Sequence, residues 1–307
     1  CIIGAGNIAK EHLKVINDIS YFKIYGIYSR TSIKSNRLSK IYNIKNVYEK
    51  IEDALLDKNI DAYLILVSAS QTFQVLKKII PSKKPFFVEK PAGKNFQESG
   101  DLVKLTNKYK NLNMVGYNRR FYSLFEKGLN LIKKKGKLLG VKIEGHERFW
   151  KVKSKIDKLN IKNWSYINSS HTIDLIRFFA GELKEMKSYN SRLIEKEKDQ
   201  FALTYKSINN TIGTYTSHWY SPGGWSVTLF GEKITVVFDP LESGYSIDRY
   251  FKKHKIKLSK FDTKYKPGFY KQMLSFKKLL ISRKNYWPSQ NIKESHKTMQ
   301  IIYKMKL

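Results

Sequence analysis

The chain has 307 residues, of which 41% are hydrophobic and 14% aromatic, so it has enough apolar surface for a globular protein of two domains and is not a disordered chain. No apolar run approaches the roughly 20 residues needed to cross a bilayer and no signal peptide precedes the first glycine turn, so we expect a cytoplasmic protein with no membrane partner. The formal net charge is +32, but only nine of the 58 basic residues are Arg and the Lys are spread along the whole chain, which argues against nucleic acid as a partner.

Short β-rich runs alternate with helical ones over the first 118 residues, which is the pattern of a parallel sheet covered by helices. Strands are predicted to end at Ile3 and to occupy 22–28, 61–67, 85–88 and 112–117, with helices after the first glycine turn and at 68–80 and 96–109. The chain opens at Cys1, its single cysteine, so we expect no internal disulfide and a first strand whose initial residues are missing. We predict an N-terminal Rossmann domain, a doubly wound parallel sheet, over residues 1–118.

The sequence GAGN, directly after the first strand, is a glycine turn between a strand and a helix. Gly4 suits the tight turn and Gly6 allows the backbone to approach a ligand closely. With Asn7 and Ile8 in the first helical turn, this segment would offer N–H groups and a positive helix dipole to a pyrophosphate. We predict a dinucleotide site here; the alternative is a plain tight turn.

The end of the second strand indicates which dinucleotide to expect. An acidic residue at this position would bind the ribose 2′-hydroxyl of NAD. The chain instead has Ser29 and Arg30, followed by Lys34 and Arg37, with no carboxylate. This pattern favours the 2′-phosphate of NADP over NAD, unless Arg30 only stacks on adenine or points to solvent.

The stretch FFVEKPAGKNFQE leaves an apolar strand directly into Glu89, Lys90 and Pro91. Ligands of open α/β sheets lie at the carboxyl ends of strands, so this carboxylate and amine are candidates for chemistry. Alternatively, the segment is a solvated turn into the next helix, with Asn95 as its N-cap and Glu98 closing a capping box.

From Arg119 the pattern changes. A helix containing Phe121 and Leu131 is followed by the segment 140–150 and by a helix over 164–181 that ends at a C-cap glycine, Gly181. Successive strands are then predicted at 200–207, 211–220, 225–231 and 234–239, before two helical segments at 268–282 and 292–305. We predict a second α/β domain over 119–307 with an open, mostly antiparallel or mixed sheet, whose C-terminal helices could pack back on the first domain.

Four motifs occur together in a recognisable order: GAGNIAKEH, FVEKPAG, VGYNRRF and HTIDLIRFFAG. In their sequence and spacing, with Lys90 placed 86 residues after Gly4, they resemble the Gfo/Idh/MocA oxidoreductase family, which includes glucose-fructose oxidoreductase and inositol dehydrogenase. The resemblance covers about the first 180 residues and is weaker beyond them. It favours the functional interpretation of the EKP segment.

The resemblance implies roles for four residues. Lys90 would lie beside the nicotinamide and the substrate hydroxyl, where an ammonium orients the reacting oxygen, and Glu89 would contact the nicotinamide side of the pocket. His171 would be the general base, since the unperturbed pKa of imidazole lies near neutrality; alternatively it is a helix-start histidine bonded to backbone. Asp174, three residues on, would orient or charge-stabilise the active-site end of the helix, or is only a carboxylate favoured by the helix dipole.

Further side chains complete the predicted site. Cofactor contacts are expected from Ser68, Thr72 and Asn118, and substrate contacts from Lys90, Tyr117, Arg119, Trp164, Asn168 and His171. Arg119 and its neighbour Arg120 could instead form plain interdomain ion pairs. His146, His254 and His296 show no ligand spacing, so no metal site is predicted.

Two departures from the family pattern concern the chemistry. Many members carry an Asp four residues before the predicted base, where this chain has Ile167, and a second family His is replaced by Thr72. If the missing Asp tunes His171, the proton relay must differ or oxidation is slow. Binding of the cofactor is less affected than turnover.

The predicted function is hydride transfer between NADP or NAD and a secondary hydroxyl of a sugar, cyclitol or nucleotide-sugar. The resemblance also implies a homo-oligomer, a dimer or tetramer built on the open sheet. Two rival functions share the fold: a cofactor-binding sensor or regulator without turnover, and a glycosidase that oxidises its sugar transiently and returns the hydride. The sequence does not identify the sugar, the carbon that is oxidised or the direction.

Overall fold

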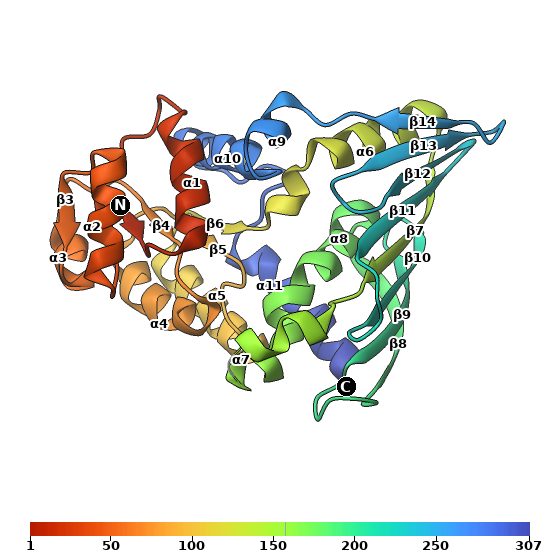
Figure 1. Cartoon of the computed structure of the whole chain (residues 1–307), viewed down its shortest axis with the longest axis horizontal. Coiled ribbons are helices and arrows are strands. Elements are labelled where there is room, and N and C mark those ends of the chain that lie inside the picture. The colour runs from red at the N-terminus through yellow and green to blue at the C-terminus, as the bar shows by residue number, and fades with distance from the viewer. Residues whose placement is uncertain (157) are drawn as a thin grey trace. The chain divides into compact units, whose positions relative to one another are not determined.

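A computed structural model describes residues 1–156 and 158–307 (Figure 1). Contacts between Cα atoms divide the chain into two compact units, the first formed by residues 1–118 and 264–297 and the second by 119–263 and 298–307. The boundary at residues 297 and 298 falls inside one helix, α11 (Ile292–Lys306). Within the described part of the chain, no helix is both long and apolar enough to span a membrane.

The first unit contains a six-stranded sheet in the order β3-β2-β1-β4-β5-β6, with every pair parallel. Its strands are β1 (Ile2–Ile3), β2 (Gly26–Tyr28), β3 (Asn46–Tyr48), β4 (Tyr63–Ile65), β5 (Phe86–Glu89) and β6 (Asn113–Gly116). This is the order of a doubly wound dinucleotide-binding fold. The central strands are apolar throughout because they are buried on both faces, and the predicted Rossmann sheet is confirmed.

Helices connect and cover this sheet. They are α1 (Asn7–Asn17), α2 (Ser32–Tyr42), α3 (Ile51–Leu56), α4 (Ala69–Ile79), α5 (Phe96–Tyr109) and α10 (Phe269–Ser282). Asn95 caps α5 as predicted, since its Oδ1 accepts from the backbone N of Glu98 at 2.8 Å. The predicted return bond of the capping box is wrong by one residue, because the Glu98 carboxylate accepts from the backbone N of Lys94 at 3.0 Å.

The second unit contains an eight-stranded sheet in the order β14-β13-β12-β11-β7-β10-β9-β8. The strands are β7 (Leu138–Gly145), β8 (Leu183–Ser191), β9 (Gln200–Ser207), β10 (Ile212–His218), β11 (Trp225–Gly231), β12 (Ile234–Phe238), β13 (Gly244–Asp248) and β14 (Lys253–Ile256). Strands β7 and β10 pair in parallel and the other neighbours are antiparallel, so the predicted mixed open sheet is confirmed. Helices α6 (Ser123–Lys135) and α8 (Ser170–Ala180) lie along one face of it (Figure 1).

Some element predictions were wrong at strand ends and sheet edges. The strand predicted at 22–28 is limited to Gly26–Tyr28. Strands β8, β13 and β14 carried no signal strong enough to predict. Strand β8 lies at the edge of its sheet and has no fully buried residue, so its sequence shows no alternation of apolar and polar side chains.

Helix α8 is buried over its whole length, from Ser170 to Ala180. A π-helical turn, Ser165–Ser169, leads into it, and Gly181 ends it with a φ of 90°, as the C-cap prediction requires. Two further short helices are α7 (Lys158–Lys162) and α9 (Lys260–Lys264). A helix that is buried all round must pair its polar side chains internally, and α8 carries the predicted base His171.

Candidate active site

The glycine turn after β1 has the geometry of a nucleotide-binding loop. Gly4 has a φ of +111°, and a Cβ there would lie 2.5 Å from the carbonyl oxygen of Leu66, so only glycine fits. The N–H of Gly4 donates to the carbonyl of Tyr28 at 2.8 Å, which ties the turn to the neighbouring strand β2. The turn is therefore determined by backbone packing in the sheet.

The N-terminus of α1 suits a pyrophosphate. Gly6 is the N-cap, it is exposed together with Asn7, and a Cβ built on it would meet nothing within 4 Å. The N-cap glycine has no side chain to occupy this helix end, and the first turn contains no acidic residue. Exposed N–H groups at the positive end of an 11-residue helix attract anions, so the segment from Gly6 to Ile8 fits the predicted pyrophosphate.

Basic side chains gather after β2, where the cofactor ribose is predicted to lie. Arg30 is exposed, and Lys34 and Arg37 are exposed on α2, whose first turn has no acidic residue. Ser29 is half-buried, and its hydroxyl accepts from the backbone N of Thr31 at 3.3 Å. The segment after β2 has cations for a 2′-phosphate, and its residues 29–37 include no carboxylate for a 2′-hydroxyl.

Ser68 and Thr72, at the start of α4, differ in accessibility. Ser68 is exposed and its hydroxyl bonds to that of Ser70 at 3.2 Å. Thr72 is buried and its hydroxyl donates to the carbonyl of Ser68 at 3.1 Å, within the same helix. The structure therefore makes Ser68 the better placed of the two for a cofactor contact.

Strand β5 ends at Glu89, and Lys90 follows with a cis peptide bond to Pro91. Glu89 and Lys90 are both half-buried, whereas Pro91 is buried. The Glu89 carboxylate bonds to Nε2 of His12 on α1 at 2.7 Å. His12 belongs to the GAGNIAKEH motif, but sequence reasoning gave it no role.

Two residues that follow β6, Tyr117 and Asn118, are buried. Tyr117 is buried in the hydrophobic core of the first unit, and its hydroxyl is shielded from solvent. Asn118 is buried, and its side-chain amide donates to the carbonyl of Pro267 at 3.1 Å. In this arrangement both side chains support the fold.

A cavity of about 430 Å³ lies within the second unit. Three residues predicted to contact substrate line it together: Arg119, Trp164 and Asn168. Other lining residues, which the sequence did not identify, include Glu147, Trp225 and Glu242. Aromatic walls with a few polar groups are typical of small-molecule sites.

Glu147 organises this cavity. It is buried directly beyond β7, and its carboxylate accepts from Trp164 Nε1 at 3.0 Å, from Ser169 Oγ at 2.7 Å and from the side-chain amide of Asn168. These donors flank Ile167, the position where the resemblance expected an Asp. The carboxylate of Glu147 therefore reaches the segment around Ile167 from another element. The sequence feature that could have indicated Glu147 was its place directly after a strand.

Burial shifts the pKa values of two titratable groups at or near the cavity. Burial lowers the pKa of His146, a lining residue, which favours the uncharged imidazole near neutral pH. Burial also raises the pKa of Tyr122, whose hydroxyl donates to Glu242 at 2.9 Å. The hydroxyl of Tyr122 therefore remains a donor, and it holds the Glu242 carboxylate.

His171 packs against Trp225, and Trp225 lines the cavity. The rings of His171 and Trp225 are 5.9 Å apart, and the guanidinium of Arg119 lies 4.4 Å from the Trp225 ring on which it stacks. The imidazole is buried at the start of α8. The predicted base and a predicted substrate residue thus contact the same indole.

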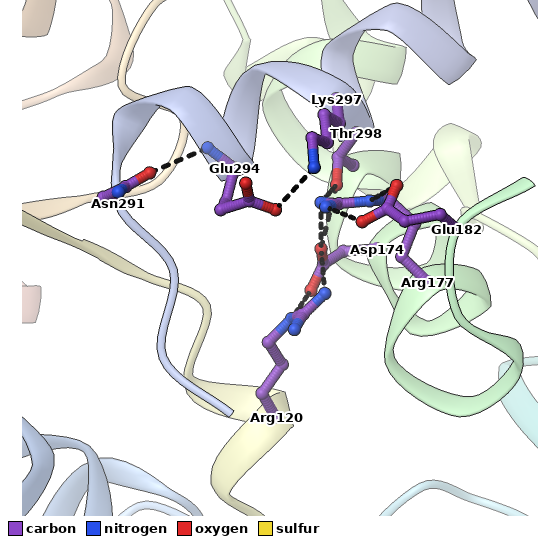
Figure 2. A network of polar contacts seen from close by, with 8 residues as sticks. All are labelled: Arg120, Asp174, Arg177, Glu182, Asn291, Glu294, Lys297 and Thr298. Carbon is purple, nitrogen blue, oxygen red and sulfur yellow. Dashed lines mark hydrogen bonds and ion pairs between the residues drawn. The ribbon is translucent and has the colours of Figure 1, made fainter. Parts of the chain in front are cut away.

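Asp174 lies in a buried network of polar contacts (Figure 2). Its carboxylate accepts from Arg120 Nε at 2.6 Å, from Arg120 Nη2 at 3.0 Å and from Thr298 Oγ1 at 2.9 Å. Arg177 in turn donates to Thr298 Oγ1 at 3.1 Å and to Glu182 Oε1 at 2.6 Å. This pairing ties α8 to the segment before α6 and to α11, so Asp174 is placed to hold the helix that carries His171.

Comparison with known proteins finds similarity to oxidoreductases. Residues 1–117 match the model of the oxidoreductase family with an NAD-binding Rossmann fold, GFO_IDH_MocA. The oxidoreductase YrbE of Bacillus subtilis is 27% identical over 201 residues, which are 63% of this chain and 57% of the relative. Myo-inositol 2-dehydrogenase of Thermotoga maritima is 23% identical over 206 residues, 64% of this chain and 59% of the relative. The chain thus matches less than two thirds of the length of these relatives.

The fold is shared over nearly the whole chain. A dehydrogenase from Clostridium difficile superposes with a TM-score of 0.82 and 17% identity, covering 99% of this chain and 97% of that one. At such low identity this likeness shows the fold alone. The similarity to the family lies in residues 1–117 and in the motifs that these residues carry. Residues 1–117 are therefore similar to the NAD-binding domain of the Gfo/Idh/MocA oxidoreductases.

Proposed function

We propose that this chain is an NAD(P)-dependent oxidoreductase that transfers hydride between the nicotinamide and a secondary hydroxyl of a sugar, cyclitol or nucleotide-sugar. One observation in the first unit carries the proposal. Strand β1 pairs with β4 and β4 pairs with β5, all in parallel, so the glycine turn and the Lys90 loop leave the same edge of the sheet. Neighbouring strands are about 4.8 Å apart, which separates the two loops by roughly 10 Å. A dinucleotide held at Gly6 can extend over this length.

Two side chains would act on the substrate. The Lys90 ammonium would orient the reacting oxygen and stabilise the negative charge that develops on it. His171 would accept the hydroxyl proton during oxidation and return it during reduction. Asp174 would act as a positioning residue through α8. The bound nicotinamide supplies the hydride chemistry that these side chains lack.

The cavity of the second unit supports a polyhydroxylated substrate. Trp164 and Trp225 contribute aromatic rings to its lining, and Glu147 contributes a carboxylate. Sugars offer apolar C–H faces and hydroxyl donors to such a wall. The relative from Thermotoga maritima, a myo-inositol 2-dehydrogenase, agrees with this substrate class.

The two glycines of the turn make separable predictions. Gly6 has an ordinary φ of −79°, and an added methyl group would meet nothing within 4 Å. The change Gly6→Ala should therefore leave the midpoint of thermal unfolding unchanged. The methyl group would occupy the place of the pyrophosphate, and the Kd for NAD(P)H should rise about tenfold or more, equivalent to about 1.4 kcal/mol. Gly4→Ala should instead lower the midpoint of thermal unfolding, because its Cβ collides with backbone. Equal effects of both changes on stability would contradict this division of roles.

We also propose that the enzyme prefers NADP. Arg30→Ala should weaken NADPH binding about tenfold to hundredfold, the range expected for lost hydrogen bonds to a charged phosphate. NADH binding should change by less than about twofold, because NADH lacks the 2′-phosphate. Lys40→Ala, an exposed cation in the last turn of α2, is the matched control. Fluorescence titration with both nucleotides checks the prediction, and equal losses for both would show that Arg30 only stacks on adenine.

The deciding experiment combines binding and turnover on one preparation. NADPH and NADH are titrated by fluorescence, and turnover is then measured with a panel of sugars, cyclitols and nucleotide-sugars. Tight binding with turnover supports the proposal. Tight binding without turnover on any substrate would favour a sensor, and cleavage of a glycoside with no net change in nucleotide absorbance would indicate a glycosidase. Failure to bind either nucleotide would overturn the proposal.

We also propose that the chain self-associates through the open sheet of the second unit. The face of the sheet away from α8 carries exposed apolar side chains at Tyr189, Ile212 and Phe230. Exposed apolar groups that share one sheet face favour an interface. Light scattering should give the mass of a dimer or tetramer, and Ile212→Lys should reduce it.

A further inference from the structure

A buried pair, His12 and Glu89, joins α1 to the loop that carries Lys90. His12 is completely buried, and its Nε2 lies 2.7 Å from Glu89 Oε1. The two residues are 77 positions apart in the chain, so the contact exists only in the folded sheet. It connects the helix of the glycine turn with the end of β5, and both belong to the first unit.

The His12 ring is held rigidly. Phe87 packs against it edge-on with ring centroids 5.1 Å apart, and Phe269 of α10 packs at 4.7 Å. Its second nitrogen, Nδ1, is buried and has no hydrogen-bond partner among the described residues. A proton on Nδ1 would leave a buried donor unsatisfied, so the ring proton belongs on Nε2, facing Glu89.

The Glu89 carboxylate is confined from another side by β6. Glu89 is the register partner of Gly116, and a Cβ on Gly116 would lie 3.1 Å from Glu89 Oε1 and 2.9 Å from the Phe87 ring. The absence of a side chain at Gly116 therefore makes room for the carboxylate. Glu89 is thus confined by Gly116 of β6 on one side and bonded to His12 on the other. A charge-assisted hydrogen bond of this kind is stronger than a neutral one.

We propose that His12 is a positioning residue that fixes the Glu89 carboxylate and, through it, the turn of Glu89, Lys90 and Pro91. The turn lies outside regular secondary structure, because the strand ends at Glu89 and α5 begins only at Phe96. A carboxylate with a fixed orientation adjacent to Lys90 determines where the ammonium is presented. The catalytic consequence rests on the proposed function of Lys90, whereas the structural consequence does not.

The first test measures the loop without any enzyme assay. Hydrogen exchange of peptides covering residues 86–95 should accelerate about tenfold or more in His12→Leu, which keeps the apolar packing and removes the donor. His12→Gln, whose side-chain amide can reach the carboxylate, should restore most of the protection. His296→Leu is the matched control, since this half-buried imidazole in the first unit bonds to Ser99 at 3.0 Å but does not touch Glu89. Unchanged exchange in His12→Leu would overturn the proposal.

A double-mutant cycle separates positioning from general destabilisation. If His12 acts through Glu89, His12→Leu should change the exchange of this segment by less than about twofold in a Glu89→Leu background. An effect of the same size in both backgrounds would show that His12 only fills space, and would contradict the proposal. If His12→Leu does not fold, His12→Gln and Glu89→Leu are compared directly, and unchanged exchange in Glu89→Leu would contradict it equally.

Kinetics then connect the pair to Lys90. In an active preparation, His12→Leu should lower kcat about tenfold to hundredfold and leave the Kd for NADPH within about threefold. His12→Gln should recover kcat, and His296→Leu should retain it. Loss of nucleotide binding in parallel with kcat would assign His12 to the glycine helix instead. An inactive wild-type protein would contradict the proposed function, while the exchange results would still decide the role of His12.

Discussion

Replacing Lys90 by Met should lower kcat/KM by about two to four orders of magnitude, the range typical for loss of one proton-transfer or charge-stabilising group. Met keeps the aliphatic stem, so packing of the half-buried side chain is largely preserved. The lost ammonium would have stabilised the negative charge on the reacting oxygen, which develops mainly in the transition state. Binding of NADPH should therefore change by no more than a few fold, and the loss should appear in kcat rather than in the affinity for the nucleotide.

A second lysine in the same loop provides the control. Lys94 lies four residues further on, and its ammonium pairs with Glu98 at 2.8 Å in the first turn of α5. Lys94→Met should leave kcat/KM within about twofold, because the Lys94 ammonium is already paired with Glu98 and has no proposed role in the reaction. Similar losses in Lys90→Met and Lys94→Met would mean that the loop responds to its overall charge and that Lys90 has no specific role.

Removing Arg120 should lower the free energy of unfolding by about 3–5 kcal/mol, the cost of breaking a buried ion pair. Arg120→Ala eliminates two charge-assisted bonds to the Asp174 carboxylate, at 2.6 and 3.0 Å, in surroundings that exclude water (Figure 2). The carboxylate remains buried in α8, where loss of its guanidinium partner is not compensated by solvent. Urea unfolding followed by circular dichroism measures the change.

An exposed ion pair serves as the control that shows whether burial causes the expected loss of stability in Arg120→Ala. Lys78 and Glu52 lie 2.7 Å apart at the surface of the first unit, a distance close to that between Arg120 and Asp174. Lys78→Ala should give no resolvable shift of the urea midpoint, because solvent replaces the lost partner. If Arg120→Ala were equally silent, the network around Asp174 would not stabilise α8, and Asp174 would lose its proposed positioning role.

The part of the candidate site that lies in the first unit was predictable because its features are local. The turn at Gly4 follows from backbone geometry over a few residues, and the cap at Asn95 follows from a bond to the third residue after it. Alternation of apolar runs with helical periods was sufficient to predict the parallel sheet. Such features depend on neighbours in the sequence, and neighbours in the sequence leave a readable pattern.

Partners that are distant in the chain left no such pattern. Asp174 was identified, but its guanidinium partner is 54 residues away and its hydroxyl partner 124 residues away. Glu147 was missed for the same reason, since its donors lie 17 to 22 residues further on. Tyr117 was assigned to the substrate by the resemblance to the family, and only the structure shows that its ring packs into the core.

The sequence by itself determined the parallel sheet of the first unit, the glycine turn and the position of Lys90 at a strand end, because local sterics and hydrophobic periodicity determine these features. Only the tertiary structure decided that α10 joins the first unit, that β7 lies between β10 and β11, and that Glu147 reaches the segment around Ile167. It also decided that His12 meets Glu89. The physical reason is that apolar patterning shows which side chains become buried, whereas the partner of a buried polar group depends on how distant segments pack.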